Sequence, residues 1–150
     1  MKSLWNTTEA DLCQNELDLR VYSSRLLGSD PSLVLHGGGN TSVKIYETNL
    51  FGEQEEILYV KGSGWDLATI EGAGFTPVHM AHLLRLAQLE SLSDSEMVNQ
   101  LKTQQTVANA PTASVEAILH AALPFKYVDH THADAIITLT NTPQGEQLIR

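Results

Sequence analysis

The chain of 150 residues is long enough to bury the core of one domain, and its 42% hydrophobic and 18% charged residues exclude intrinsic disorder. The formal net charge of −9 argues against a broad nucleic-acid-binding surface, although a few backbone amides and one lysine can still bind a small phosphate. Because Cys13 is the only cysteine, no apolar run approaches the length of a membrane span, and the N-terminus has no apolar segment, we expect a cytoplasmic protein without a signal peptide or membrane partner.

The first half of the chain predicts one helix followed by strands. A helix is predicted from Thr8 to Leu27, before a glycine and a proline end the pattern. Residues 33–35 predict a short buried strand. The alternating stretch 41–46 and the apolar stretch 57–60 predict two further strands, which the polar loop between them would join as a hairpin.

Helical patterns dominate the second half. Pro77 can open a helix that carries the apolar stripe from Met80 onward, Ser93 begins a capping box, and residues 111–123 predict a third helix. Residues 127–130 predict a strand, and residues 133–140 are ambiguous between helix and strand. With no internal repeat, the order of elements favours a single layered α/β or α+β domain whose sheet is at least partly antiparallel.

Two histidines stand two residues apart, His130 and His132, at the end of the predicted strand. Alternate residues of a strand share one face, so both imidazoles can converge on a metal, although a polar strand end is an equally simple interpretation. Glu116 and His120 are four apart in a predicted helix and share a face. They are either a solvated pair or a carboxylate, with a packed imidazole, directed into a site as ligand or general base.

Three separate loops are rich in hydrogen-bond donors that suit an anion. The first is the glycine-rich stretch 36–42, the second is Lys61–Gly64, and the third carries Thr112 and Ser114 just before Glu116. Taken singly, each loop is also typical of an ordinary turn or helix cap. The His-Gly-Gly-Gly run is found in esterase oxyanion holes as well, but the G-x-S-x-G elbow that such an enzyme needs is absent from the sequence.

In this order, the motifs Gly39–Ser42, Lys61–Gly64, Pro111–Glu116 and Asp129–Ala133 resemble the class II aldolase/adducin family. The stretch Leu35–Lys44 is especially similar to the aldolase domain of bifunctional rhamnulose-1-phosphate aldolase/alcohol dehydrogenase proteins. The resemblance implies a layered αβα domain over residues 1–150 with a central, largely antiparallel sheet. It also implies a homo-oligomer, a tetramer in much of the family. The family's third zinc histidine lies further downstream and no histidine follows His132, so we expect the C-terminal part of the domain to be missing.

The resemblance further implies a chemistry and a set of residues. Zinc would be held by His130 and His132, with Glu116 as the catalytic acid/base and the third ligand available in this chain. The substrate phosphate would be held by Asn40, Ser63, Gly64, and Thr112 or Ser114. The expected reaction is cleavage of a ketose 1-phosphate, of the rhamnulose 1-phosphate type, to dihydroxyacetone phosphate and an aldehyde through an enediolate. Two alternatives stay open: a pentulose-phosphate 4-epimerase that uses the same site, and a non-catalytic assembly module like that of adducin.

Overall fold

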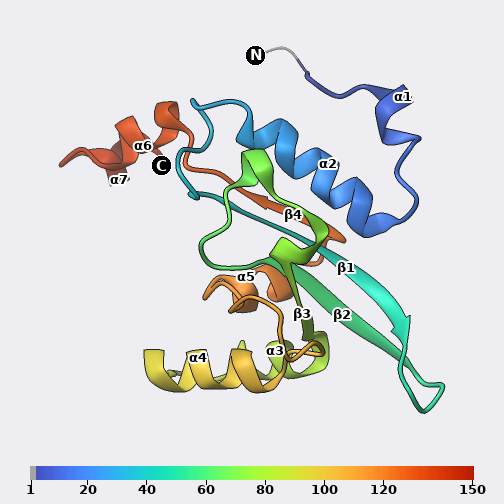
Figure 1. The fold of residues 1–150 in the computed structure, drawn as a ribbon. Coiled ribbons are helices and arrows are strands. Elements are labelled where there is room, and N and C mark those ends of the chain that lie inside the picture. The colour runs from blue at the N-terminus through green and yellow to red at the C-terminus, as the bar shows by residue number, and fades with distance from the viewer. Residues whose placement is uncertain (1–2) are drawn as a thin grey trace.

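A four-stranded sheet with the order β3-β2-β1-β4 forms the centre of the computed structural model, which describes residues 3–150 (Figure 1). Every neighbouring pair of strands is antiparallel. The strands are β1 (Asn40–Thr48), β2 (Gln54–Lys61), β3 (Phe75–His79) and β4 (Tyr127–His130). The helices are α1 (Thr7–Ala10), α2 (Glu16–Gly28), α3 (Met80–Leu86), α4 (Asp94–Thr103), α5 (Ala117–Ala122), α6 (Asp134–Thr140) and α7 (Gly145–Leu148), with two short 3-10 turns at Leu67–Thr69 and Gly72–Gly74.

The predicted hairpin is confirmed, and it is longer than the pattern indicated. Strands β1 and β2 pair with Val43 opposite Tyr59 and stay paired out to Thr48 opposite Gln54. The side chain of Asn49 accepts hydrogen bonds from two backbone amides of the turn, and Gly52 takes a φ of 83° that an L-residue rarely adopts. The loop therefore carries its own turn chemistry, which a sequence pattern can reveal.

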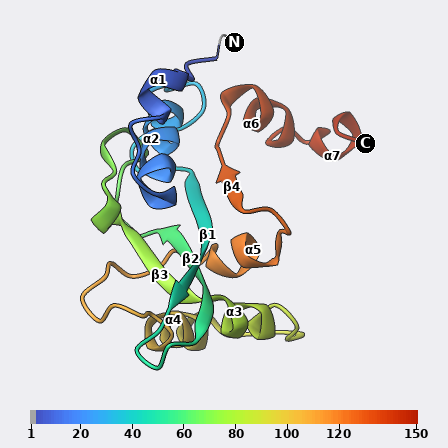
Figure 2. The ribbon, with the colours of Figure 1, turned by 90° about the vertical axis from the view of Figure 1, so that its right-hand side faces the viewer.

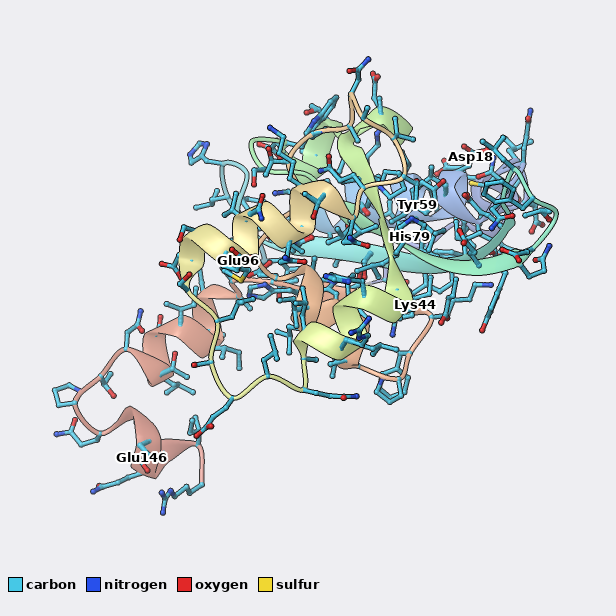
Figure 3. The ribbon with its side chains drawn as sticks, turned by 90° about the horizontal axis from the view of Figure 1, so that it is seen from below. Asp18, Lys44, Tyr59, His79, Glu96 and Glu146 are labelled. Carbon is cyan, nitrogen blue, oxygen red and sulfur yellow. The ribbon has the colours of Figure 1, made fainter. Side chains whose placement is uncertain are left out.

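Helices cover both faces of the sheet, which gives the αβα layering predicted (Figures 1 and 2). On one face α2 packs against β1 and against a core that includes Leu67, Ile70 and Phe75. The opposite face carries α3, α4 and α5, as the view from below shows (Figure 3). There the core includes Leu83 of α3 and Leu101 of α4.

Two expectations for the first half of the chain are wrong. The predicted single helix is divided into α1 and α2, because Asn6 and Asn15, rather than Thr8, accept the first amide hydrogen bonds of the two helices. Residues 33–35 form no strand: Val34 is buried, but its amide bonds back to Asp30 in a turn. This segment still contacts the end of β4, since the carbonyl of Leu33 accepts a hydrogen bond from His132 N at 2.9 Å.

Two expectations for the second half also need correction. Pro77 lies inside β3 and the helix begins only at Met80; β3 is an edge strand with one neighbour, where a missing N–H is tolerated. The predicted helix 111–123 is helical only from Ala117, because Gly62 bridges Ala113 and holds the preceding segment extended. The helix start at Ser93, whose hydroxyl accepts from Glu96 N, and the strand 127–130 are confirmed, and residues 134–140 are helical.

The C-terminal helices α6 and α7 extend away from the sheet, and α6 buries none of its residues (Figure 2). Within residues 3–150, no helix combines the length and the apolar character that crossing a bilayer requires.

Candidate metal centre

The register between β1 and β4 brings the site together. Asn40, the first residue of β1, pairs directly with His130, the last residue of β4, so both side chains project from the same face of the sheet. Ser42 and Lys44 follow at alternate positions on that face. The ammonium of Lys44 donates to the carbonyls of Ala121 and Leu123 at the end of α5. The helix is therefore fixed against the strand that carries Asn40.

Glu116 immediately precedes α5 and meets His130 at the mouth of the site. Its Oε1 lies 2.8 Å from His130 Nδ1, and the two side chains keep 29% and 35% of their surface exposed. The two atoms are close but not aligned as donor and acceptor, which suits atoms that converge on a third partner. Burial raises the pKa of Glu116. Contacts with Asn40 and His130, together with the potential of His130 and His120, lower this pKa by more than burial raises it, so the carboxylate is ionised at neutral pH.

His120 lies behind this pair and is fully buried. Its Nδ1 is 2.8 Å from Ser42 Oγ, whereas its Nε2 has no hydrogen-bond partner among the described residues. Burial lowers the pKa of His120 to about 4, with Glu116 opposing the shift, so the imidazole is neutral at physiological pH. An imidazole with one nitrogen held by a hydroxyl and the other free has the arrangement that metal-ligating histidines usually show.

The group formed by Glu116, His120 and His130 fits a metal ion. One ligand atom from each residue lies within 4.8 Å of the others, and the set offers one carboxylate oxygen and two imidazole nitrogens. The buried atoms without a hydrogen-bond partner in residues 3–150 are Asn40 Oδ1, His120 Nε2 and His130 Nδ1, and all belong to this site. Unpaired buried polar atoms are costly, so their concentration here indicates a missing partner. Nitrogen and oxygen donors of this kind are typical of zinc.

His132, predicted as the second imidazole ligand, lies beside the group but is not a member of it. Strand β4 ends at His130, so strand alternation does not fix the direction of His132. Its ring nevertheless stands 4.9 Å from that of His130, centroid to centroid, at an interplanar angle of 62°. Gly38 makes this position possible, because a Cβ there would lie 3.3 Å from His132 Nδ1 and 2.9 Å from the carbonyl of Leu35.

The predicted anion-binding loops meet near the start of α5. The amide of Ser63 donates to the carbonyl of Thr112 at 2.9 Å, which places Ser63 and Gly64 beside the segment that leads to Glu116. The side chains of Ser63 and Thr112 are exposed, whereas Ser114 Oγ accepts a 3.3 Å hydrogen bond from Glu116 N. Ser114 is thus already committed to shaping the backbone at Glu116.

Lys61 and Arg20 are buried cations close to this assembly; the sequence patterns included Lys61 only as part of a loop motif and did not single out Arg20. Lys61, 5% exposed, donates to the carbonyl of Gly37 at 2.9 Å and so ties β2 to the glycine-rich loop. Burial lowers the pKa of Lys61, while Glu116 and Asp66 act in the opposite direction. Lys61 stands inside the Lys-Gly-Ser-Gly motif, so attention to that motif could have found it.

Comparison with known proteins identifies the family of the domain. The model of the class II aldolase and adducin N-terminal domain matches residues 19–149. An uncharacterized oxidoreductase, YuxG, from Bacillus subtilis strain 168 is 38% identical over 148 residues, which are 99% of this chain but only 22% of that protein. The solved N-terminal class II aldolase domain of a conserved protein from Thermoplasma acidophilum is 44% identical with a TM-score of 0.89, covering 99% of this chain and 68% of the other.

Proposed function

Because the chain belongs to the class II aldolase and adducin N-terminal domain family, we propose that it is the zinc-dependent aldolase domain of a sugar-phosphate enzyme. The proposed reaction is cleavage of a ketose 1-phosphate, of the rhamnulose 1-phosphate type, to dihydroxyacetone phosphate and an aldehyde. The chain spans about a fifth of the length of a relative that is named an oxidoreductase. That is compatible with an aldolase domain that works beside a dehydrogenase in one polypeptide.

The contact between Glu116 and His130, with the buried and unpaired nitrogen of His120 behind it, carries this proposal. These residues would hold a zinc ion together with His132, whose ring stacks edgewise against that of His130. Bound zinc would supply a Lewis acid that polarises the ketone carbonyl of the substrate. Lys61 also lies near Glu116, and its ammonium donates to the carbonyl of Gly37 at 2.9 Å.

Glu116 would move the proton at the carbon where the bond breaks. Its lowered pKa keeps the carboxylate ready to accept a proton, and its partial exposure leaves it accessible to a substrate. Asn40 stands opposite His130 with its Oδ1 unpaired, so this oxygen can accept a hydrogen bond from a substrate hydroxyl. The backbone amide of Glu116 donates a hydrogen bond to Ser114 Oγ, which shapes the backbone from which the Glu116 side chain projects.

For the substrate phosphate we propose a cradle of hydroxyl and amide donors. Its members are Asn40, Ser63, Gly64, Thr112 and Ser114. Support comes from the backbone hydrogen bond between Ser63 and Thr112, which joins two of the loops, and from the exposure of both side chains. Thr112 is the more available hydroxyl of the third loop, because its side chain is exposed whereas Ser114 is partly buried.

A substrate panel tests the reaction. The zinc-loaded protein is incubated with ketose 1-phosphates that include rhamnulose 1-phosphate, and dihydroxyacetone phosphate is measured with a coupled dehydrogenase. We expect release of dihydroxyacetone phosphate from the parent and a loss of about 10²–10⁴-fold in turnover for Glu116→Gln. A pentulose phosphate in the same panel would reveal 4-epimerisation. A zinc-loaded parent without turnover of any member would contradict the catalytic proposal and favour an assembly module.

Metal titration tests the ligand set separately from turnover. We expect the zinc affinity of His130→Asn to fall furthest, because His130 touches both Glu116 and the ring of His132. His132→Asn and His120→Asn, compared side by side, identify the second imidazole ligand. His79→Asn is a matched control, since His79 lies near Glu55 and away from the site. Equal zinc affinity in all four variants would remove the metal from this position.

We also propose that the domain acts as a homo-oligomer. Val115 and Leu119 expose 54% and 57% of their surface beside the site, and Phe125 exposes 65%. Large apolar side chains gathered near a site often belong to subunit contacts. Light scattering coupled to size-exclusion chromatography would decide the matter, and a monomer at all concentrations would contradict the expectation.

A further inference from the structure

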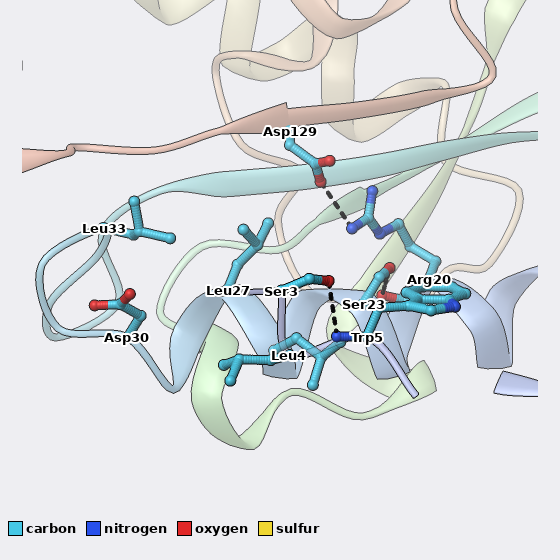
Figure 4. A pocket seen from close by; sticks show the side chains of 10 residues that line it. Ser3, Leu4, Trp5, Arg20, Ser23, Leu27, Asp30, Leu33 and Asp129 are labelled. Carbon is cyan, nitrogen blue, oxygen red and sulfur yellow. Dashed lines mark hydrogen bonds and ion pairs between the residues drawn. The ribbon is translucent and has the colours of Figure 1, made fainter. Parts of the chain in front are cut away.

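Arg20 is a buried cation on the face of the sheet opposite the metal centre. It projects from α2 and is 1% exposed. Its Nη2 lies 2.7 Å from Asp129 Oδ1, its Nη1 donates to the carbonyl of Ser42 at 3.4 Å, and its Nε donates to Ser24 Oγ at 3.1 Å. Figure 4 shows the guanidinium reaching from the helix to Asp129 on β4. One side chain therefore contacts β1 and β4 at the same time.

Both strand partners of Arg20 are immediately linked to the metal centre. Ser42 holds Nδ1 of the buried His120 with its hydroxyl, while its carbonyl receives the guanidinium. Asp129 directly precedes His130, and adjacent residues of a strand point to opposite faces. The guanidinium thus holds the backbone from one face at the point where the ligand side chains leave from the other.

Strand β4 has particular need of such a contact. It is an edge strand of four residues, and within residues 3–150 β1 is its only neighbour in the sheet. Short edge strands open more readily than central ones, because fewer hydrogen bonds and contacts hold them. A displacement of β4 would separate His130 from Glu116, which comes from α5 and is fixed through Lys44 and His120 to β1.

Stability alone gives a weak account of this arginine. Burial removes the hydration of the guanidinium, and the ion pair offsets only part of that cost, because Asp129 is 47% exposed and solvent screens its charge. The guanidinium is instead suited to geometry, since its donors form a rigid planar fork that can bind two acceptors in fixed directions. Its central carbon also lies 5.7 Å from the ring centroid of Tyr127, a second contact with β4.

We propose that Arg20 is a positioning residue that locks β4 to β1 and thereby fixes His130 against Glu116 for metal binding. The lock on β4 stands by itself, and its effect on zinc affinity rests on the proposed function. Arg20→Met keeps the length of the side chain and removes the fork. Arg25→Met is the matched control, because Arg25 lies on the same helix but donates to the carbonyl of Ile70, away from β1 and β4.

The first experiment uses zinc-free protein and measures backbone amide exchange. We expect exchange in Tyr127–His130 to accelerate by about tenfold in Arg20→Met relative to Arg25→Met, with exchange in β2 unchanged. A merely structural role would shift both strands together with the urea midpoint. Unchanged protection of β4 would overturn the proposal. If Arg20→Met fails to fold, Asp129→Asn provides the same comparison, because Asp129 is 47% exposed and its loss of charge weakens the same contact.

The second experiment titrates zinc into the same proteins. We expect Arg20→Met to lose at least about tenfold in zinc affinity while Arg25→Met keeps that of the parent. Co²⁺ absorption bands should shift in Arg20→Met alone. Loss of β4 protection with parental zinc affinity would refute the role in metal binding. A parent that binds no zinc would refute the proposed function, and amide exchange alone would then decide whether Arg20 locks β4.

Discussion

Replacing Ser42 by alanine is a sharp test of the metal centre. Ser42 and His120 are both fully buried, and the hydroxyl lies 2.8 Å from His120 Nδ1. Without the hydroxyl, the imidazole has no hydrogen-bond partner on either nitrogen, because Nε2 already lacks one among the described residues. A buried polar group left unpaired costs about 1–3 kcal/mol. We therefore expect Ser42→Ala to lower the free energy of unfolding of the zinc-free protein by about that amount.

The same substitution should weaken zinc binding. The hydroxyl of Ser42 holds the ring of His120 in its orientation, and partners of this kind typically contribute about 10–100-fold to metal affinity. The measurement is a competition titration against a chromogenic zinc chelator, combined with urea denaturation of the zinc-free protein. Both readings use the folded domain and need no substrate.

Thr41→Val provides the control on the neighbouring residue. Thr41 is equally buried, but its hydroxyl faces α2 and lies 2.8 Å from Ser24 Oγ, which also bonds to the carbonyl of Arg20. Its loss should cost about 0.5–1.5 kcal/mol of stability and leave zinc affinity unchanged. Equal zinc affinity in the two variants, or parental stability of Ser42→Ala, would refute the reasoning.

Three further outcomes are expected. Gly38→Ala should displace the ring of His132 and the carbonyl of Leu35, destabilise the protein by about 1–3 kcal/mol, and lower zinc affinity; a titration that matches the parent would exclude His132 as a ligand. Burial, with a hydrogen bond to Glu47, raises the pKa of the Tyr59 hydroxyl above its usual value of 10.0. The stability that the protonated hydroxyl contributes is therefore complete below about pH 10 and is lost as the pH rises above that value. Tyr59→Phe should accordingly show a smaller decline in urea midpoint above about pH 10 than the parent. Zinc at a hundredfold excess over its dissociation constant should stabilise the fold by about 2.7 kcal/mol, and a chelator should reverse the gain in thermal melting; an unchanged melting temperature would argue against any metal site.

Local sequence patterns predicted an element correctly where residues within that element determine its structure. The hairpin 41–60 follows from alternation and turn residues, and the helix after Ser93 follows from its capping box. The pattern fails where distant residues decide. Pro77 looks like the first residue of a helix, but pairing with β2 holds it in a strand. Residues before Ala117 look helical, but the bridge between Gly62 and Ala113 extends them.

The site was only partly predictable for the same reason. Spacing suggested that Glu116 shares a face with His120, and the family resemblance connected both with His130. Their convergence depends on the pairing of Asn40 with His130, a register that no local pattern specifies. Arg20 was missed altogether, because a single arginine in an amphipathic helix gives no indication that it is buried against two strands.

Successive residues of strand β1 serve different faces of the sheet. Asn40, Ser42 and Lys44 face α5 and the metal centre, whereas Thr41 faces α2, and the intervening Val43 follows the same alternation. A mutational scan along this strand should therefore alternate between defects in zinc binding and defects in folding alone. Removing one residue from the glycine-rich loop would be far more damaging than any substitution, because a slip of one position exchanges the two sets of side chains.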